Sequence, residues 1–264
     1  MAEKAFLLDT TKCMGCRACQ VACKQWNDLP GEATEFFAGP EYTNPAELSA
    51  ITWNHVKFFE IDRSNEEHPV WQIMHKKCYH CEHANCMTVC PEHAISRHDG
   101  WVVIDQDKCI GCGACVNECI YKVPHISRTD YKSHKCNACT VHKRDIPACA
   151  FACPTNALMY GNRYEMLHEA ESRLRKYKQA QFPNASLYGR DQFGGLNMLV
   201  ILKDRPSKFG LEENPVPISM ARAEQIRDTY AMLSLFTFGL PSLKRVAYRI
   251  SKSLSSAEKQ SRIS

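Results

Sequence analysis

The sequence has no long apolar run, no nucleotide-binding glycine loop and no strong excess of charge of either sign. Its 33 lysine and arginine residues nearly balance 29 aspartate and glutamate residues, which gives a formal net charge of +4 over 264 residues. This balance predicts no nucleic-acid partner. The uncharged stretch 229–243 contains Gly239 and Pro241 and is shorter than the roughly 20 apolar residues that a membrane-spanning helix needs. We therefore expect no transmembrane helix.

Features of secreted proteins and of hydrolytic enzymes are also missing. Residues 1–9 lack the apolar centre of a secretory signal. We expect a cytoplasmic protein or one attached peripherally to a membrane, with export beside a signal-bearing partner as the alternative. Disulfide bonds are accordingly not expected, although the cysteine count of 16 is even. No Ser-His-Asp set and no paired acids stand out, which predicts a protein without a catalytic centre of its own.

What the sequence does contain is a repeated cysteine pattern that uses every cysteine. Two runs have three cysteines two residues apart and a fourth after three more: Cys13, Cys16, Cys19 and Cys23, and Cys109, Cys112, Cys115 and Cys119. Two further runs stretch the middle gap and end before a proline: Cys78, Cys81, Cys86 and Cys90, and Cys136, Cys139, Cys149 and Cys153. In bacterial ferredoxins this spacing binds 4Fe-4S clusters, and the fourth cysteine of a run ligates the other cluster.

The spacing has a mechanical reason. Three corners of a small cube are reached from one tight loop, whereas the fourth cysteine lies one helical turn further on and points away. The crossover rule predicts four 4Fe-4S clusters. Their expected ligands are Cys13, Cys16, Cys19 and Cys153 for cluster one; Cys136, Cys139, Cys149 and Cys23 for cluster two; Cys78, Cys81, Cys86 and Cys119 for cluster three; and Cys109, Cys112, Cys115 and Cys90 for cluster four.

Zinc is the main structural alternative, because paired cysteines two residues apart are also its signature. A zinc site usually takes two such pairs, however, and a triad on one loop leaves the fourth cysteine without a place. Histidines surround the second run without a haem-attachment sequence or a zinc-type helical pair, so they predict no haem or zinc site: His75, His80, His83, His93 and His98.

The fold class expected from this pattern is α+β, with two ferredoxin-like modules, one inserted within the other, and a C-terminal helical extension. Apolar runs predict strands over 5–9, 55–62, 70–75 and 100–105, and a short helix over 20–26. The expected divisions are an outer module (1–30 and 120–160), an insertion and strand (31–69), an inner module (70–119), a scaffold helix and strand (161–218) and C-terminal docking helices or tail (219–264). The insertion is either a partner-contacting loop or a packed flap.

The C-terminal part predicts scaffolding. Asn162, with Glu165 three residues on, predicts the start of a surface helix, and the pair Gly194-Gly195 precedes a buried strand over 196–202. Residues 243–254 predict a basic amphipathic helix. That helix would dock on a partner or on this chain; a membrane-surface contact or a disordered tail are the alternatives.

Four lysines lie close in sequence to expected ligands: Lys76, Lys77, Lys108 and Lys135. Solvent-exposed lysines at loop edges are the simpler interpretation. The alternative hypothesis is that they raise the local reduction potentials.

Beyond the cysteines, three segments carry a resemblance to a known family. Residues 13–28, which end in Gln25-Trp26-Asn27-Asp28, together with 187–195 and 209–215, resemble the iron-sulfur beta subunit of formate dehydrogenases. The resemblance implies a non-catalytic subunit that relays electrons between a molybdenum or tungsten bis-pterin catalytic subunit and a downstream acceptor subunit or carrier, which can be membrane-associated. Membrane-bound members end in a transmembrane helix, and this chain departs from them there. The alternatives are a subunit of another such oxidoreductase or of a hydrogenase, an independent polyferredoxin, and a zinc scaffold.

Overall fold

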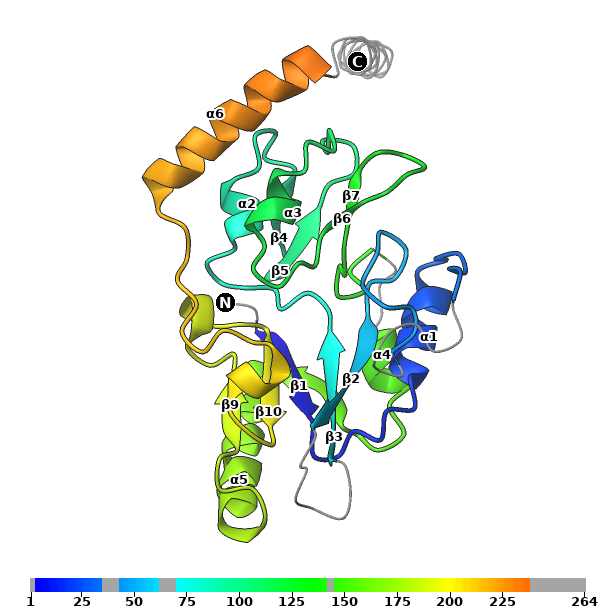
Figure 1. The fold of residues 1–264 in the computed structure, drawn as a ribbon, viewed down its shortest axis with the longest axis vertical. Helices are drawn as coiled ribbons and strands as arrows, with labels where there is room; N and C mark the ends of the chain where they lie inside the picture. The colour runs from blue at the N-terminus through cyan, green and yellow to red at the C-terminus, as the bar shows by residue number, and fades with distance from the viewer. Residues whose placement is uncertain (1–2, 35–42, 62–69, 142–144, 238–264) are drawn as a thin grey trace, which may run out of the picture.

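The computed structural model describes residues 3–34, 43–61, 70–141 and 145–237 (Figure 1). The helices are α1 (Ala18–Trp26), α2 (Asn85–Thr88), α3 (Ala114–Glu118), α4 (Ala148–Phe151), α5 (Arg163–Ala180) and α6 (Met220–Thr237), with 3-10 turns at Gln192–Gly194 and Pro206–Phe209. The strands are β1 (Lys4–Asp9), β2 (His55–Ile61), β3 (Val70–Lys76), β4 (Ile95–His98), β5 (Trp101–Ile104), β6 (His125–Ile126), β7 (Ser133–His134), β8 (Leu158–Asn162), β9 (Ser186–Tyr188) and β10 (Met198–Leu202). The strands and the short helix expected from the N-terminal half are confirmed within a few residues.

A four-stranded sheet in the order β8-β1-β10-β9 joins the beginning of the chain to its C-terminal part. The central pair is parallel, with Phe6 opposite Met198 and Leu8 opposite Val200, while β8 and β9 pair antiparallel at the edges. Every residue of β10 is buried. An unbroken apolar strand of this kind is typical of a sheet that is covered on both faces.

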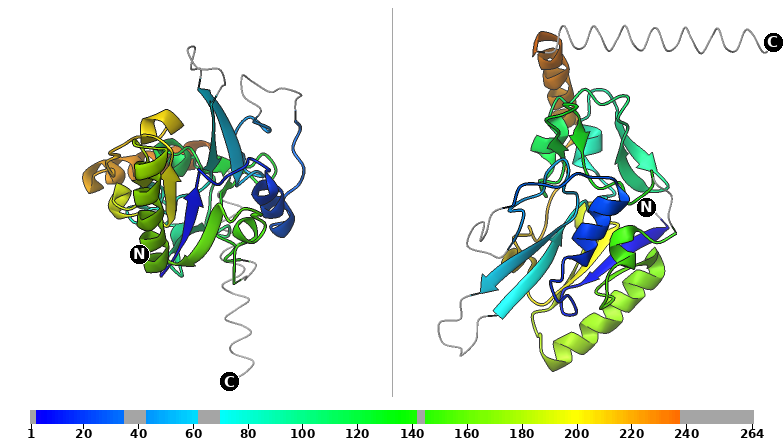
Figure 2. Two further views of the ribbon diagram at one scale, coloured as in Figure 1. Left: turned by 90° about the horizontal axis from the view of Figure 1, so that it is seen from below. Right: turned by 90° about the vertical axis from the view of Figure 1, so that its right-hand side faces the viewer.

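Helix α5 covers one face of this sheet, beside β1 and β10 (Figure 2). Its predicted N-cap is confirmed, because the Asn162 side chain accepts hydrogen bonds from the backbone N-H groups of Tyr164 and Glu165. The helix is also held by a buried ion pair, in which the Arg173 guanidinium lies 3.1 Å from the fully buried Asp9 carboxylate. The expected scaffold helix and buried strand therefore form one layered unit.

The cysteine-bearing segments lie on the other side of the sheet and are built from hairpins and short helices. Hairpins β2-β3, β4-β5 and β6-β7 are each antiparallel, and the helices contact each other in two pairs, α1 with α4 and α2 with α3. Figure 1 shows α2 and α3 beside β4 and β5, and α1 and α4 beside β2. Each pair combines helices from two cysteine runs.

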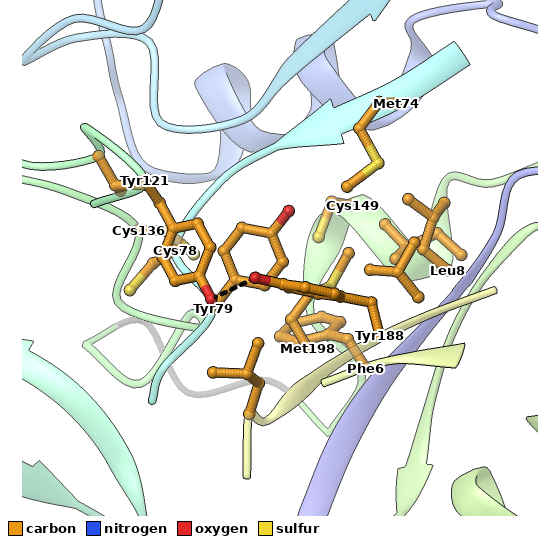
Figure 3. Packing of buried hydrophobic residues seen from close by; sticks show 14 of the residues in the cluster. Phe6, Leu8, Met74, Cys78, Tyr79, Tyr121, Cys136, Cys149, Tyr188 and Met198 are labelled. Carbon is orange, nitrogen blue, oxygen red and sulfur yellow. Dashed lines mark hydrogen bonds between the residues drawn. The ribbon is translucent and has the colours of Figure 1, made fainter. Parts of the chain in front are cut away.

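Aromatic side chains link these pairs to the sheet (Figure 3). Tyr79 stacks on Tyr121 with ring centroids 4.2 Å apart, and the Tyr121 and Tyr188 hydroxyls are 3.0 Å apart in a hydrogen bond. Cys78, Cys136 and Cys149 lie in the same buried cluster as these rings. Cys19 of the first run belongs to the same cluster, so three of the cysteine runs share one continuous core.

The insertion and the C-terminal extension are described in part. Within 43–54, Leu48, Thr52 and Asn54 are buried, so this stretch packs against the body of the chain; residues 35–42 lie outside the described part. Helix α6 projects from the body (Figure 1) and contacts α2 and α3 through its first turns. Among the described helices, none has the length and apolar character needed to cross a membrane. The predicted basic helix over 243–254 lies outside the described residues.

Candidate metal centres

The backbone of the first and third cysteine runs repeats the same conformations. Gly15 and Gly111 both have a φ of +70°, and the residues that precede α1 and α3, Arg17 and Gly113, are both left-handed, with φ of 61° and 84°. These turns curl the loop around its own centre, so that three cysteine side chains reach a common point. Left-handed residues are uncommon outside glycine, and their recurrence reflects the internal duplication seen in the spacing.

Three cavities are each bordered by four cysteines, and every set draws one cysteine from a second run. We number the sites as the clusters above. Site two is bordered by Cys23, Cys136, Cys139 and Cys149; site three by Cys78, Cys81, Cys86 and Cys119; and site four by Cys90, Cys109, Cys112 and Cys115. Four thiols around one void are the ligand set of a 4Fe-4S cluster, so the residues present fit that group.

Site one consists of Cys13, Cys16, Cys19 and Cys153. Cys13 lies close enough to Cys16 and Cys153 for their charges to raise its pKa, after the larger effect of burial. Cys19 also lies near Cys13. The structure therefore brings Cys16, Cys19 and Cys153 near Cys13, as the predicted set requires.

Helix ends explain the crossover geometry. Cys86 lies in α2 and serves site three, whereas Cys90, just beyond the end of that helix, borders site four. Reciprocally, Cys115 lies in α3 and borders site four, whereas Cys119 at the end of α3 borders site three. The two short helices pack against each other, and the last cysteine of each run therefore borders the site formed mainly by the other run.

Burial raises the pKa of Cys19 and Cys115 and so disfavours their thiolate forms when no metal is bound. Burial, followed by the neighbouring Cys149, raises the pKa of Cys19 to about 12. Burial likewise raises the pKa of Cys115 to about 12, against the opposing effect of a hydrogen bond with Ser133. Metal ligands must be deprotonated, so cluster binding displaces protons from these sites, and its free energy contributes to folding.

Backbone N-H groups point at the sulfur atoms. Ala94 N lies 3.3 Å from Cys90 Sγ and Leu158 N lies 3.3 Å from Cys153 Sγ. Ser133 N lies 3.4 Å from Cys109 Sγ, and Ala138 N lies 3.4 Å from Cys136 Sγ. Hydrogen bonds to ligating sulfur are one of the means by which a protein tunes a cluster.

His75 is a site residue to which the sequence assigned no role. It is buried on β3, and its Nε2 atom lies 3.4 Å from Cys13 Sγ. Burial, reinforced by the charge of Lys77, lowers the pKa of His75 to about 3, so the imidazole is neutral. In the sequence, the only sign of this role is that His75 lies three residues before the ligand Cys78.

The four lysines near the ligands fall into two classes. Lys76 pairs with Glu47 at 2.8 Å and Lys108 lies 3.6 Å from Asp105, and both keep partly exposed side chains. Lys77 and Lys135 are instead buried, with relative exposures of 1% and 4%. The interpretation as exposed loop-edge lysines is correct for Lys108, whereas Lys76 is half-buried at the end of β3, and it is wrong for Lys77 and Lys135.

The cysteine geometry and the family comparisons define the class. Residues 12–94 and residues 69–163 each match a family described as a 4Fe-4S dicluster domain. This chain is therefore an iron-sulfur protein of the dicluster ferredoxin class, as the cysteine spacing predicts, and the disulfide and zinc alternatives are not supported.

Curated relatives narrow the class further. The nitrate-inducible formate dehydrogenase iron-sulfur subunit of Escherichia coli K12 is 36% identical over 221 residues, which cover 81% of this chain and 74% of the relative. The formate dehydrogenase iron-sulfur subunit of Haemophilus influenzae is 34% identical over 220 residues, 81% of this chain and 70% of the relative. The hydrogenase-2 operon protein HybA of Escherichia coli O157:H7 is 28% identical over 263 residues, 84% and 77% of the two chains. The chain belongs to the family of formate dehydrogenase iron-sulfur subunits.

Proposed function

We propose that this chain is the electron-transfer subunit of a formate dehydrogenase, which relays electrons through four 4Fe-4S clusters between a catalytic subunit and a downstream acceptor. The observation that supports it most directly is that 12 of the 16 cysteines border three cavities in sets of four, which leaves the four expected ligands of site one. Each set would hold one cluster through four thiolates. When bound, these clusters supply one-electron oxidation and reduction.

The cysteine sets also have an order that suits a relay. Cys19 of site one lies near Cys149 of site two, and Cys78 of site three lies near Cys136 of site two. Sites three and four share the α2-α3 pair. We infer a row in which sites two and three are inner and sites one and four are outer. In this arrangement the module with α1 and α4 holds sites one and two, the module with α2 and α3 holds sites three and four, and the row passes from one module to the other between sites two and three.

The catalytic partner would carry molybdenum or tungsten on a bis-pterin, as the resemblance of residues 13–28, 187–195 and 209–215 implies. A second candidate, the equivalent subunit of a hydrogenase or of another molybdenum or tungsten oxidoreductase, rests on the similarity to HybA. The identity to HybA is lower than to the formate dehydrogenase subunits, which favours the first candidate.

The proposal is tested by purifying the native complex without oxygen and measuring its metals and its activity. We expect about 16 iron atoms in this subunit, four for each cluster, together with molybdenum or tungsten in the partner and formate-dependent reduction of a viologen dye. If the subunit has this iron content but the complex shows no formate activity, the four-cluster relay is supported and formate is excluded as the partner's substrate. Zinc in place of iron would overturn the proposal.

The crossover assignment has its own test. In the complex, Cys119→Ser should change the EPR signal of the same cluster as Cys81→Ser, because both cysteines are assigned to site three. Cys90→Ser should instead change the same signal as Cys112→Ser, in site four. If Cys119→Ser and Cys112→Ser alter one signal together, the exchange between helix ends is wrong.

A further inference from the structure

Each cysteine site has a different polar side chain beside its sulfur atoms. Site one has the His75 imidazole, 3.4 Å from Cys13 Sγ, and also Lys203, which lies near Cys13 and is partly exposed. Site four has Ser133, whose hydroxyl lies 3.3 Å from Cys115 Sγ. Sites two and three have Lys77 and Lys135, which are both buried. A buried lysine therefore lies beside each of sites two and three, whereas the lysine near site one is partly exposed.

Lys77 directs its ammonium group at site two. It follows directly after β3, and its Nζ atom lies 3.5 Å from Cys149 Sγ and 3.4 Å from the centre of the Phe6 ring. The other charges that act on it most strongly are those of Cys136 and Cys23, also of site two. Within the described residues, no acidic side chain pairs with it.

Lys135 occupies the matching position at site three. Its Nζ atom donates to the backbone carbonyls of Val102 and Cys136, and the charges that act on it most strongly are those of Cys78 and Cys86. In turn it lowers the pKa of all four cysteines of site three, against the larger effect of burial on each: Cys78, Cys81, Cys86 and Cys119. Its location next to Cys136 sets it on the boundary with site two.

Both ammonium groups are held by contacts within the sites and not by solvent. Lys77 lines site two with its Nζ atom 3.5 Å from Cys149 Sγ, and Lys135 lines site three and donates to two backbone carbonyls. Isolated buried charges are strongly unfavourable unless an opposite charge compensates them. A cluster with four thiolate ligands is such a compensating anion, and each electron that it accepts adds one negative charge.

We propose that Lys77 and Lys135 are fixed buried cations that raise the reduction potentials of the inner clusters, at sites two and three, above those of the outer clusters, at sites one and four. The inference rests on the proposed function. A cation at short range in a low-dielectric interior stabilises the reduced cluster more than the oxidised one. Two electrons released together by a two-electron donor would then collect at the centre of the row and leave from it one at a time.

The test is an EPR-monitored redox titration of the purified complex. Lys77→Met removes the charge at similar length, and we expect one cluster signal to shift to lower potential, with a smaller shift at site one. Lys135→Met should shift a different signal in the same direction. Lys77→Arg and Lys135→Arg keep the charge and should restore potentials close to those of the wild type. The matched controls are Lys76→Met and Lys108→Met, which remove partly exposed lysines that are also close in sequence to cysteines and should leave all four potentials unchanged.

A second measurement keeps the inference testable if a methionine variant does not fold. In the wild-type chain background, Cys149→Ser marks the signal of site two, Cys78→Ser that of site three, Cys13→Ser that of site one and Cys112→Ser that of site four. We expect the two signals of highest potential to be those of sites two and three. If either belongs to an outer site, or if the methionine variants keep wild-type potentials, the inference is overturned while the four-cluster relay stands. Absence of cluster signals would instead contradict the proposed function itself.

Discussion

Position 111, in the loop of site four, accepts only glycine because the backbone of Tyr131 lies too close for a Cβ atom. A Cβ atom at Gly111 would lie 1.7 Å from the carbonyl oxygen of Tyr131, and its φ is +70°. Gly113, two residues on, has a φ of +84° but open space where a Cβ would stand. Both positions need a left-handed backbone, and only the first is also closed by another segment of the chain.

We expect Gly111→Ala to disrupt site four and Gly113→Ala to be tolerated. The left-handed conformation costs about 1–2 kcal/mol for a residue with a Cβ, and this cost destabilises both variants. In Gly111→Ala the new Cβ also clashes with the carbonyl oxygen of Tyr131, so the backbone must move. Iron content after anaerobic purification and the EPR signal of one cluster should fall in Gly111→Ala only. Equal iron loss in the two variants would show that conformational strain, and not the clash, decides the outcome.

The sequence was sufficient to find all the cysteines but not the charges beside them. Cysteine spacing is a local property, set by how few residues a loop needs to reach three corners of a cube. Burial of Lys77, which directly follows β3, depends on which side of this extended segment meets the core, since successive side chains of an extended chain point to opposite sides. Lys76 and Lys77 therefore have opposite environments, and the mixed sequence of β3 did not indicate which of the two would be buried.

At the scale of elements, local patterns predicted α5 and β10 but not their partners. Asn162 predicts the start of α5, and the apolar stretch after Gly195 predicts β10; each signal lies within the element that it predicts. The parallel pairing of β1 with β10 joins the start of the chain to its C-terminal part. The sequence of neither strand indicates that the other is its partner. Long-range pairing of this kind is decided by the shape of the whole core, which includes the loops that carry the cysteines.

Helix α6 is held by a small contact next to sites three and four. Ala223 is fully buried against Val89 and Ala114, with Ile218 and Ile226 packed around it. The neighbouring α2 and α3 carry cysteines at their ends, so the contact connects the C-terminal helix to the inner module. A small residue at 223 is needed because the helices approach closely there.

We expect Ala223→Asp to release α6 and to leave the clusters in place. Burying a carboxylate without a partner costs several kcal/mol, which exceeds what so small a contact contributes. Hydrogen exchange of residues 220–230 should become fast in this variant. Ala221→Asp is the matched control, because Ala221 is exposed in the same turn. Equal protection in both variants, or loss of iron from Ala223→Asp, would contradict this account of the contact.

At the scale of the whole molecule, the chain combines a core that depends on metal with one that does not. The core around site four is small, and cysteines make up much of it: Ala84, Cys90, Ala94, Ile95, Val102, Cys109 and Cys115. The core between α5 and the sheet is apolar and, among the described residues, free of cysteine: Ala5, Leu7, Met166, Ala170, Leu199 and Ile201. A two-stranded hairpin is at most marginally stable alone, so the cysteine-bearing half needs its metal.

We therefore expect cluster removal to unfold the molecule in part. Chelation of iron under reducing, oxygen-free conditions should make the amides of α2, α3 and the β4-β5 hairpin exchange quickly, because the free energy of cluster binding no longer supports them. Amides of β1, β10 and α5 should keep much of their protection, since their apolar contacts and the Asp9-Arg173 ion pair remain. Hydrogen exchange followed by mass spectrometry, before and after chelation, resolves these segments. Simultaneous loss of protection in all of them would mean that the sheet also depends on the clusters, and that the four sites and the scaffold fold as one unit.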